Sequence, residues 1–389
     1  MRSKQELIKN IMEKAVTGNQ LAGLNALVLK DGEEKFYADA GYANIEEKRP
    51  FKRDTIVRLY SQSKPVTAAA AMLLIQDGII EPYESVGDYI PSFKKQEIVE
   101  KGVRRPVRED RPMFIKDLLD MTSGLVYPFI NTPAEVGTGK LYDEMIERFS
   151  TGDMMSTMEF AERLGEVPLN FQPGEHFQYG TSADVLGAVI EKASGMKLSE
   201  FMNERLFKPL NMKDTAFYVP AEKKDRFATA YICNGEDTPK PYSGNNLGIR
   251  DDGNKNAFES GGAGLFSTID DYANFARMLM NGGTFEGKEI LTRRTVEFMT
   301  NAKLTPWQQQ DLYSWQCLGG FSYGNLMRIM KEPEKAGIMA GMGEYGWDGW
   351  LGPYFVNDPE SRTTFLMLTQ RTDYGTGPVT RKIRNVIFS

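Results

Sequence analysis

Residues 60–80 read YSQSKPVTAAAAMLLIQDGII and carry the strongest structural signal in the chain. From Val66 onward the stretch is almost entirely apolar, and a helix that is apolar on nearly every side belongs in the middle of a fold. Ser61 and Lys64 lie three residues apart, so the hydroxyl and the ammonium share one helical face, and Pro65 limits how far the helix extends upstream. We therefore expect a serine with a base beside it at a buried helix entrance, near the positive end of the helix dipole.

This Ser-x-x-Lys pair has two interpretations. In the structural one, Ser61 caps the helix and Lys64 extends its stem along apolar surface to keep its ammonium in water. In the catalytic one, Lys64 takes the proton of Ser61 as the hydroxyl attacks a substrate. The spacing alone occurs by chance in long chains, so the rest of the sequence has to decide between them.

Composition excludes several classes of function. The chain has 389 residues and is 41% hydrophobic, enough to bury a sizeable core in one large discontinuous domain or two closely packed ones. Its net charge of −6 gives no general affinity for nucleic acid. Cys233 and Cys317 show neither metal-ligand spacing nor a disulfide framework, so we expect no metal site and no cofactor.

The N-terminal residues 1–16 are charged and amphipathic, without the apolar core of a secretory signal. No later stretch is long and apolar enough to span a bilayer. We therefore expect a cytoplasmic protein that has no membrane partner, and the sequence leaves its oligomeric state open.

Periodicity and turn residues divide the chain into three parts. The first part reads as a helix over residues 4–16, a hairpin that turns at Asp31-Gly32, and an extended piece over residues 55–60 that leads to the serine. From about residue 82 to 210, helical segments prevail, including a helix over residues 182–193 that ends at Ser194-Gly195.

Strand patterns return after about residue 261 and end with a strand over residues 363–369 and a helix over residues 378–388. These patterns predict an α/β sheet domain made of residues 1–81 and 211–389, and a mainly helical domain made of residues 82–210.

Several motifs taken together resemble those of the serine β-lactamase and penicillin-binding-protein superfamily, specifically its class C-like branch, which also contains family VIII carboxylesterases. The match runs from about residue 21 to 370, and its motifs are Ser61-Gln62-Ser63-Lys64, Leu118 to Leu125, Pro173-Gly174 before Tyr179, Gly261 to Thr268, and Tyr345 to Gly349. The resemblance implies an α+β, transpeptidase-like fold. In that fold a mixed, mainly antiparallel sheet is built from both chain ends and flanked by helices, a largely helical region is inserted, and the active site lies in the groove between them.

Tyr179 completes the catalytic set in the frame of this family. A serine hydroxyl needs a base, and the one histidine of the chain, His176, reads as an ordinary, partly exposed loop residue. A lysine can serve as the base when burial depresses its pKa, and a tyrosine beside it can relay the proton. Ser61, Lys64 and Tyr179 supply these groups, while an ordinary structural role is the alternative for the tyrosine.

Two positions depart from the β-lactamase pattern. Where that pattern has Tyr-x-Asn, this chain has Thr181, which offers no carboxamide to a substrate amide. Where it has Lys-Thr-Gly, this chain has Trp347-Asp348-Gly349, which is similar to the Trp-containing motif of family VIII esterases. We assign these four residues to the substrate-binding site. The missing lysine and the negative charge of Asp348 predict poor binding of substrates that bear a carboxylate.

The resemblance also implies an oxyanion hole formed by the backbone amides of Ser61 and Trp350. Gly349 would let the strand approach the scissile group closely. Ordinary core packing is the alternative for both Trp347 and Trp350.

The sequence thus predicts a serine hydrolase that forms a covalent acyl-serine, in the first place a carboxylesterase whose substrate is a small or medium acyl ester. A class C-like β-lactamase, a D-amino-acid peptidase acting on an amide substrate and an acyltransferase are the neighbouring alternatives. A binding module that has kept the fold without catalysis is the alternative from another class. The joint presence of Ser61, Lys64 and Tyr179 argues against that module, because a degenerate site would be expected to lose one of them.

Overall fold

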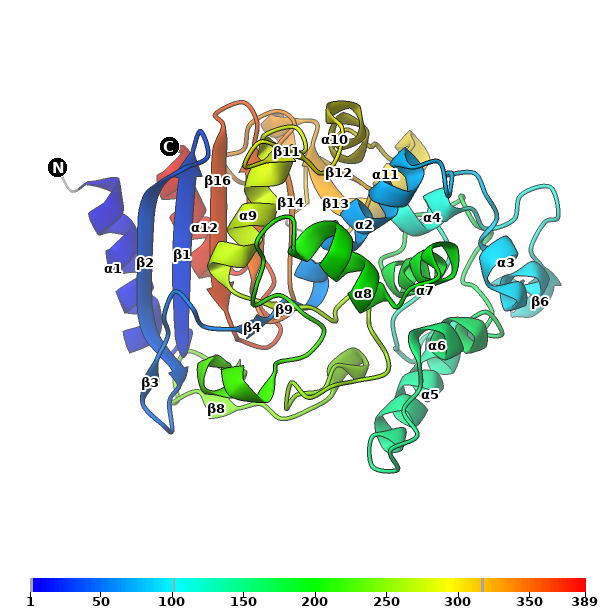
Figure 1. The fold of residues 1–389 in the computed structure, drawn as a ribbon, viewed down its shortest axis with the longest axis horizontal. Helices are drawn as coiled ribbons and strands as arrows, with labels where there is room; N and C mark the ends of the chain where they lie inside the picture. Colours follow the sequence, from blue (N-terminus) through cyan, green and yellow to red (C-terminus); the bar gives the residue numbers. More distant parts are fainter. Residues whose placement is uncertain (1–2, 101, 316–317) are drawn as a thin grey trace.

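Both ends of the chain contribute strands to one sheet in the computed structural model, which describes residues 3–100, 102–315 and 318–389 (Figure 1). Cys317 lies outside these ranges. The strands of the sheet are β1 (Gly23–Lys30), β2 (Glu33–Asn44), β3 (Arg49–Pro50), β12 (Phe321–Gly324), β13 (Met327–Met330), β14 (Tyr345–Asp348), β15 (Tyr354–Asp358) and β16 (Thr363–Thr369).

Their order is β12-β13-β14-β15-β16-β1-β2-β3, and all neighbouring pairs in the described residues run antiparallel. The strands from the two ends of the chain join in one sheet because β1 pairs with β16. The predicted α+β class and the two-ended sheet are confirmed, with an antiparallel sheet in place of a mixed one.

The hairpin between β1 and β2 turns on Asp31 and Gly32, as the sequence predicts. Their φ angles of 54° and 79° are in the left-handed region. A two-residue turn of type I′ requires this region at both central positions, and Asp-Gly tolerates it well. The turn therefore sets the pairing of β1 with β2 next to it, and a bulge between Val28 and Leu29 shifts the register farther along the strands.

Helices cover both faces of the sheet, and the alternation of side chains along β16 shows how. Phe365 and Met367 face a cluster with helices α1 (Lys4–Thr17) and α12 (Pro378–Phe388), whereas Leu366 and Leu368 face the main core, which contains α9 (Ile269–Met280). Figure 1 shows α1 and α12 beside each other at the edge of the molecule where both termini lie. Residues 365–368 of β16 thus contribute alternately to the two cores.

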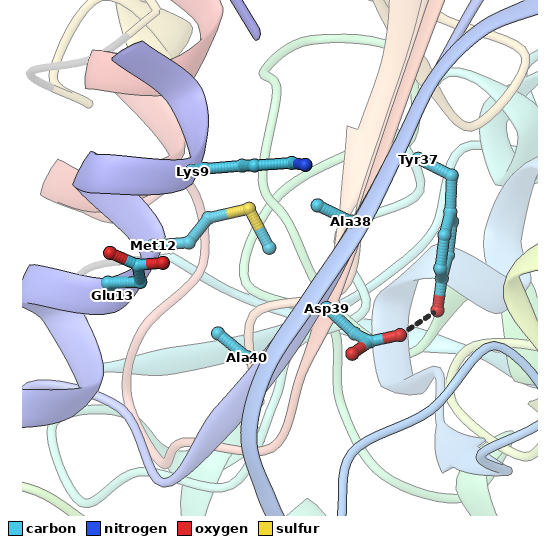
Figure 2. A pocket seen from close by; sticks show the side chains of 7 residues that line it. All are labelled: Lys9, Met12, Glu13, Tyr37, Ala38, Asp39 and Ala40. Carbon is cyan, nitrogen blue, oxygen red and sulfur yellow. Dashed lines mark hydrogen bonds between the residues drawn. The ribbon is translucent and has the colours of Figure 1, made fainter. Parts of the chain in front are cut away.

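A groove of about 390 Å³ lies between α1 and β2, and Figure 2 shows the side chains that line it. Ala38 and Ala40 point toward α1, and their small side chains leave space under the helix, whereas Tyr37 points to the other side and donates a hydrogen bond to Asp39 at 2.9 Å. The groove is a consequence of small residues on the helix-facing side of the strand.

The middle of the chain is mainly helical and packs into the same core as the sheet. The remaining helices are α2 (Lys64–Gln76), α3 (Val86–Tyr89), α4 (Ile115–Leu119), α5 (Pro133–Arg148), α6 (Thr157–Leu164), α7 (Ser182–Ser194), α8 (Leu198–Met202), α10 (Arg293–Thr300) and α11 (Pro306–Leu312). Within the predicted helical region there is also a hairpin of β5 (Glu97–Glu100) and β6 (Val103–Pro106), which the sequence did not indicate. The domain boundaries at residues 82 and 210 stay a prediction.

The apolar helix α2 lies in the centre of the molecule and packs against α7 (Figure 1). The extended piece expected over residues 55–60 is shorter than predicted: only Val57–Arg58 form a strand, β4, which pairs with β9 (Phe266–Ser267). Tyr60 then takes a left-handed φ of 47° and begins a 3₁₀ helix, Tyr60–Ser63, that leads into α2. No helix of the described residues has the length and apolar character needed to cross a bilayer.

Candidate active site

Lys64 points its amine at Ser61 from within the core. Its Nζ lies 3.1 Å from Ser61 Oγ, 2.9 Å from the Tyr127 hydroxyl and 2.8 Å from the carbonyl oxygen of Gly262. The Lys64 side chain is completely buried. A lysine that extends its stem to reach water would not be placed in this way.

Burial also changes the acidity of this amine. It lowers the pKa of Lys64 to about 7, against the weaker opposing effects of the carboxylates of Asp184 and Asp348. Asp184 is itself buried and accepts a hydrogen bond from the amide of Gly262, whose carbonyl contacts the amine. Near neutral pH a large fraction of Lys64 is therefore uncharged and able to accept a proton.

Tyr179 lies just before α7, with its hydroxyl between the serine and the third motif. Trp347 Nε1 donates a hydrogen bond to this hydroxyl at 2.9 Å, and the side chain of Ser61 also hydrogen bonds to it. Burial raises the pKa of Tyr179 well above its usual range, and these two hydrogen bonds offset only part of the effect. The side chain is therefore a phenol at neutral pH, suited to donate a proton rather than to take the first one.

Tyr127 is a member of this cluster that the sequence reasoning missed. Its ring lies 5.6 Å from the ring of Tyr179, and its hydroxyl is the one that contacts Lys64, whose Nζ lies over the ring of Tyr179 at 4.7 Å. The two tyrosine segments touch because Gly180 has no side chain: a Cβ there would lie 2.3 Å from the carbonyl oxygen of Leu125. Only the position of Tyr127 just after the motif of residues 118–125 could have drawn attention to it.

The structure does not bring Thr181 to the substrate side of the cluster. The residue is completely buried, and its hydroxyl donates to the carbonyl oxygen of Val126 at 3.4 Å. The hydroxyl of Thr181 therefore stabilises the segment that carries Tyr127. The sequence instead predicts a place for Thr181 in the substrate-binding site.

The strand motif approaches Ser61 through a glycine. A Cβ on Gly349 would lie 2.1 Å from the carbonyl oxygen of Leu59, so only glycine lets the end of β14 lie against the serine segment. The ring of Trp350 packs on Tyr60 at 5.0 Å. The backbone N–H groups of Ser61 and Trp350 donate to no other group among the described residues, and an oxyanion hole requires such free donors.

Asp348 has a partner that the sequence did not indicate. Arg328 on β13 donates to its Oδ1 at 2.8 Å, and this arginine is buried, with its guanidinium 5.6 Å from the ring of Trp347. The sequence predicts that the negative charge of Asp348 disfavours a substrate carboxylate. The ion pair compensates part of that charge.

A cavity of about 490 Å³ opens beside the serine. Its wall contains most of the predicted site residues, namely Ser61, Tyr179, Trp347, Asp348, Gly349 and Trp350. The wall also includes Tyr127, Phe129, Trp315 and Tyr374, so aromatic rings dominate it. No group of three or more His, Cys, Asp or Glu side chains that could hold a metal ion occurs in the part of the chain that the structure describes.

His176 lies elsewhere. Its Nδ1 is 3.1 Å from Asp311 Oδ2, its ring packs against Phe171 and Trp307, and it lines a different cavity from the one at Ser61. Its position agrees with the ordinary loop role expected from the sequence.

Comparisons with known proteins show which family the sequence and the fold resemble. The Beta-lactamase family model matches residues 6–386. Protein Rv1367c of Mycobacterium tuberculosis (strain ATCC 25618 / H37Rv) is 30% identical, over 85% of this chain and 81% of its own. Esterase EstB of Burkholderia gladioli is 28% identical, over 97% of this chain and 94% of its own. The solved structure of EstCE1, described as a hydrolase with promiscuous acyltransferase activity, superposes with a TM-score of 0.81 at 25% identity, over 99% of this chain and 98% of its own.

Proposed function

The chain belongs to the β-lactamase family, as a serine hydrolase with esterases among its relatives, and from this premise we propose that it is a carboxylesterase acting on small or medium acyl esters. The observation that carries the proposal is the hydrogen bond from Trp347 to Tyr179. An indole tied to the proposed proton relay occupies the motif position at which β-lactamases present a lysine to the substrate carboxylate.

In the proposed mechanism, uncharged Lys64 takes the proton of Ser61 as Oγ attacks the ester carbonyl carbon. The amides of Ser61 and Trp350 stabilise the negative charge that develops on the carbonyl oxygen. Tyr179 gives its proton to the departing alkoxide and regains one from the ammonium of Lys64. Water then attacks the acyl-serine with the same groups in the reverse roles, which releases the carboxylic acid and restores the serine.

The charge of the cavity wall favours uncharged substrates over anionic ones. Among the wall residues that the structure describes, the charged side chains are Asp348 and Asp373. A carboxylate-bearing substrate finds no cation there and forgoes a charge-assisted hydrogen bond worth about 1.5–3 kcal/mol, or about tenfold to a hundredfold in kcat/KM. An uncharged ester loses nothing and gains apolar contact with the aromatic rings. Because Arg328 compensates part of the charge of Asp348, the missing cation contributes more to this preference than repulsion does.

The decisive experiment is a chain-length series of p-nitrophenyl esters run beside nitrocefin, with intact-mass detection of the acyl-enzyme. We expect kcat/KM for p-nitrophenyl butyrate to exceed that for nitrocefin, and Trp347→Lys to shift the ratio toward nitrocefin. Ser61→Ala should form no acyl-enzyme. A wild-type enzyme that prefers nitrocefin would replace the esterase proposal by the β-lactamase one, and a folded protein that no ester acylates would favour the binding module.

Acyl transfer is the second candidate, because EstCE1 is described as a hydrolase with promiscuous acyltransferase activity. An aromatic wall suits an alcohol as acceptor in place of water. Adding a primary alcohol to the p-nitrophenyl butyrate reaction separates the two: transfer yields the butyrate ester of that alcohol, and hydrolysis yields only butyrate.

A further inference from the structure

The two carboxylates of the Ser61 cavity come from neighbouring parts of its wall. Asp373 follows β16 and is exposed at the rim, where its Oδ1 accepts a hydrogen bond from Trp350 Nε1 at 2.7 Å. Asp348 lies at the end of β14, and a Cβ on Gly375 would be 2.8 Å from its Oδ2, so the segment of residues 373–375 lies directly against it. One side of the cavity is thus acidic.

Aromatic rings line the same cavity as these carboxylates. Trp315 and Trp347 are stacked, with centroids 6.2 Å apart and an interplanar angle of 26°, and Tyr179 lies within 5.4 Å of both. The face of an aromatic ring carries the negative part of its quadrupole and attracts cations, most strongly for tryptophan. The rings and the carboxylates therefore both attract cations.

Among the described residues no lysine or arginine lines this cavity. Arg381 lines a neighbouring cavity that shares Trp347 and Asp348 with the Ser61 cavity, and Arg371 lies over the ring of Tyr374 at 5.1 Å. Arg328 is buried and forms a salt bridge with Asp348, so this pair has little net charge. Arg328 does not neutralise the charge of Asp373. Lys64 is uncharged in the form that the proposed mechanism uses. An acidic cavity lined by aromatic rings, among them the exposed Trp315, is an environment that recognises ammonium groups.

We propose that this cavity binds a positively charged group of the substrate, so that the preferred esters carry an ammonium or trialkylammonium group close to the ester bond. The inference rests on the proposed esterase function and names its substrate class. Anionic, neutral and cationic esters then form a series of rising kcat/KM.

The test compares two esters of nearly the same shape, butyrylcholine and 3,3-dimethylbutyl butyrate, in which a carbon replaces the quaternary nitrogen. At low ionic strength we expect kcat/KM for the choline ester to be about tenfold higher. Asp373→Asn should reduce this ratio about threefold, as expected for a partly exposed charge. Asparagine tolerates the left-handed φ of 52° at this position and keeps an oxygen for the Trp350 indole. Asp225→Asn removes an exposed carboxylate that does not line the cavity and should leave the ratio unchanged.

A second measurement does not depend on turnover. Choline and 3,3-dimethylbutan-1-ol are titrated into Ser61→Ala, with tryptophan fluorescence as the readout, and choline should bind about tenfold more tightly. Equal or weaker binding of choline, or a kcat/KM ratio of one or less, would overturn the inference even if p-nitrophenyl butyrate is hydrolysed. Tight choline binding without hydrolysis of any ester would uphold the cation-binding cavity and refute the esterase function instead.

Discussion

Lys64 is a charged residue type held where water does not reach, and this placement gives it the properties of a base. Its amine has three polar partners, so the uncharged form is held without losing hydrogen bonds. Desolvation disfavours the ammonium, whereas the buried carboxylate of Asp184 favours it. The balance of the two places the pKa of Lys64 close to neutral pH.

The first prediction concerns pH. With a pKa of about 7, Lys64 is mostly protonated below pH 7 and mostly uncharged above it, so kcat/KM for p-nitrophenyl butyrate should rise with pH and level off above about 7. Asp184→Asn removes a charge that stabilises the ammonium, so the midpoint should move to lower pH. The measurement is a pH profile of both proteins. A midpoint that stays in place or moves upward in the variant would mean that Asp184 does not act on Lys64 as described.

The second prediction separates the three candidate proton carriers. Tyr179→Phe keeps the ring contacts but removes the hydroxyl between Ser61 and Trp347, and we expect kcat to fall about a hundredfold or more. Tyr127→Phe removes only a hydrogen bond to Lys64 and should cost less. His176→Ala should retain nearly full activity. Steady-state kinetics with thermal unfolding as a folding check decide the matter, and an inactive His176 variant would point to a serine–histidine mechanism.

At the scale of elements, the site depends on how closely the end of β14 approaches the serine segment. Gly349→Ala would force the strand end away from Leu59, because the new methyl group would lie 2.1 Å from its carbonyl oxygen. We predict a loss of at least about tenfold in kcat, since a displaced amide of Trp350 no longer faces the oxyanion. Overpacking of this kind also costs about 1–3 kcal/mol of stability.

Gly337→Ala is the matched control for this substitution, because nothing lies within 4 Å of a Cβ at that position. The kcat of both variants and their free energies of unfolding are measured together. A Gly349→Ala protein with unchanged kcat would show that the close approach is not needed for catalysis.

Elements with strong local signals were predicted well. The helix over residues 4–16, the Asp31-Gly32 hairpin, the strand over residues 363–369 and the helix over residues 378–388 all have clear periodicity or turn chemistry, and the structure confirms them, with the first helix one residue longer. The hairpin of β12 and β13 was missed. Its strands have only four residues each, and β13 carries the buried Arg328, whose charge reads as surface in the sequence.

The candidate site follows the same rule. Ser61 and Lys64 could be paired because their contact follows from spacing along one helical turn, and Tyr179 could be added from its motif. Tyr127, Arg328 and Asp373 reach the site through tertiary packing between segments that are far apart in the chain. Neither periodicity nor spacing encodes such contacts.

At the scale of the whole molecule, the fold requires both chain ends to meet. A buried ion pair helps to hold the C-terminal helix against the sheet. Arg384 on α12 and Glu344, which directly precedes β14, are both completely buried and form a salt bridge. Arg384 also donates to the Tyr354 hydroxyl at 2.8 Å and to the carbonyl oxygen of Met339 at 2.7 Å. The pair thus ties the last helix to the strand that carries Trp347.

The last prediction follows from the cost of leaving a buried charge without its partner. Glu344→Gln keeps the shape of the side chain but leaves the Arg384 guanidinium uncompensated, and we expect the free energy of unfolding to fall by about 3–5 kcal/mol. The same substitution in an exposed ion pair, Glu297→Gln opposite Arg293, should cost less than about 1 kcal/mol. Replacing both partners, in Glu344→Leu with Arg384→Met, removes the charges together and should be less damaging than Glu344→Gln.

Denaturant unfolding of the wild type and the three variants checks this order. If Glu344→Gln is as mild as Glu297→Gln, the buried pair is not what fastens α12 to the sheet, and the apolar cluster between α1, α12 and β16 must hold the chain ends together.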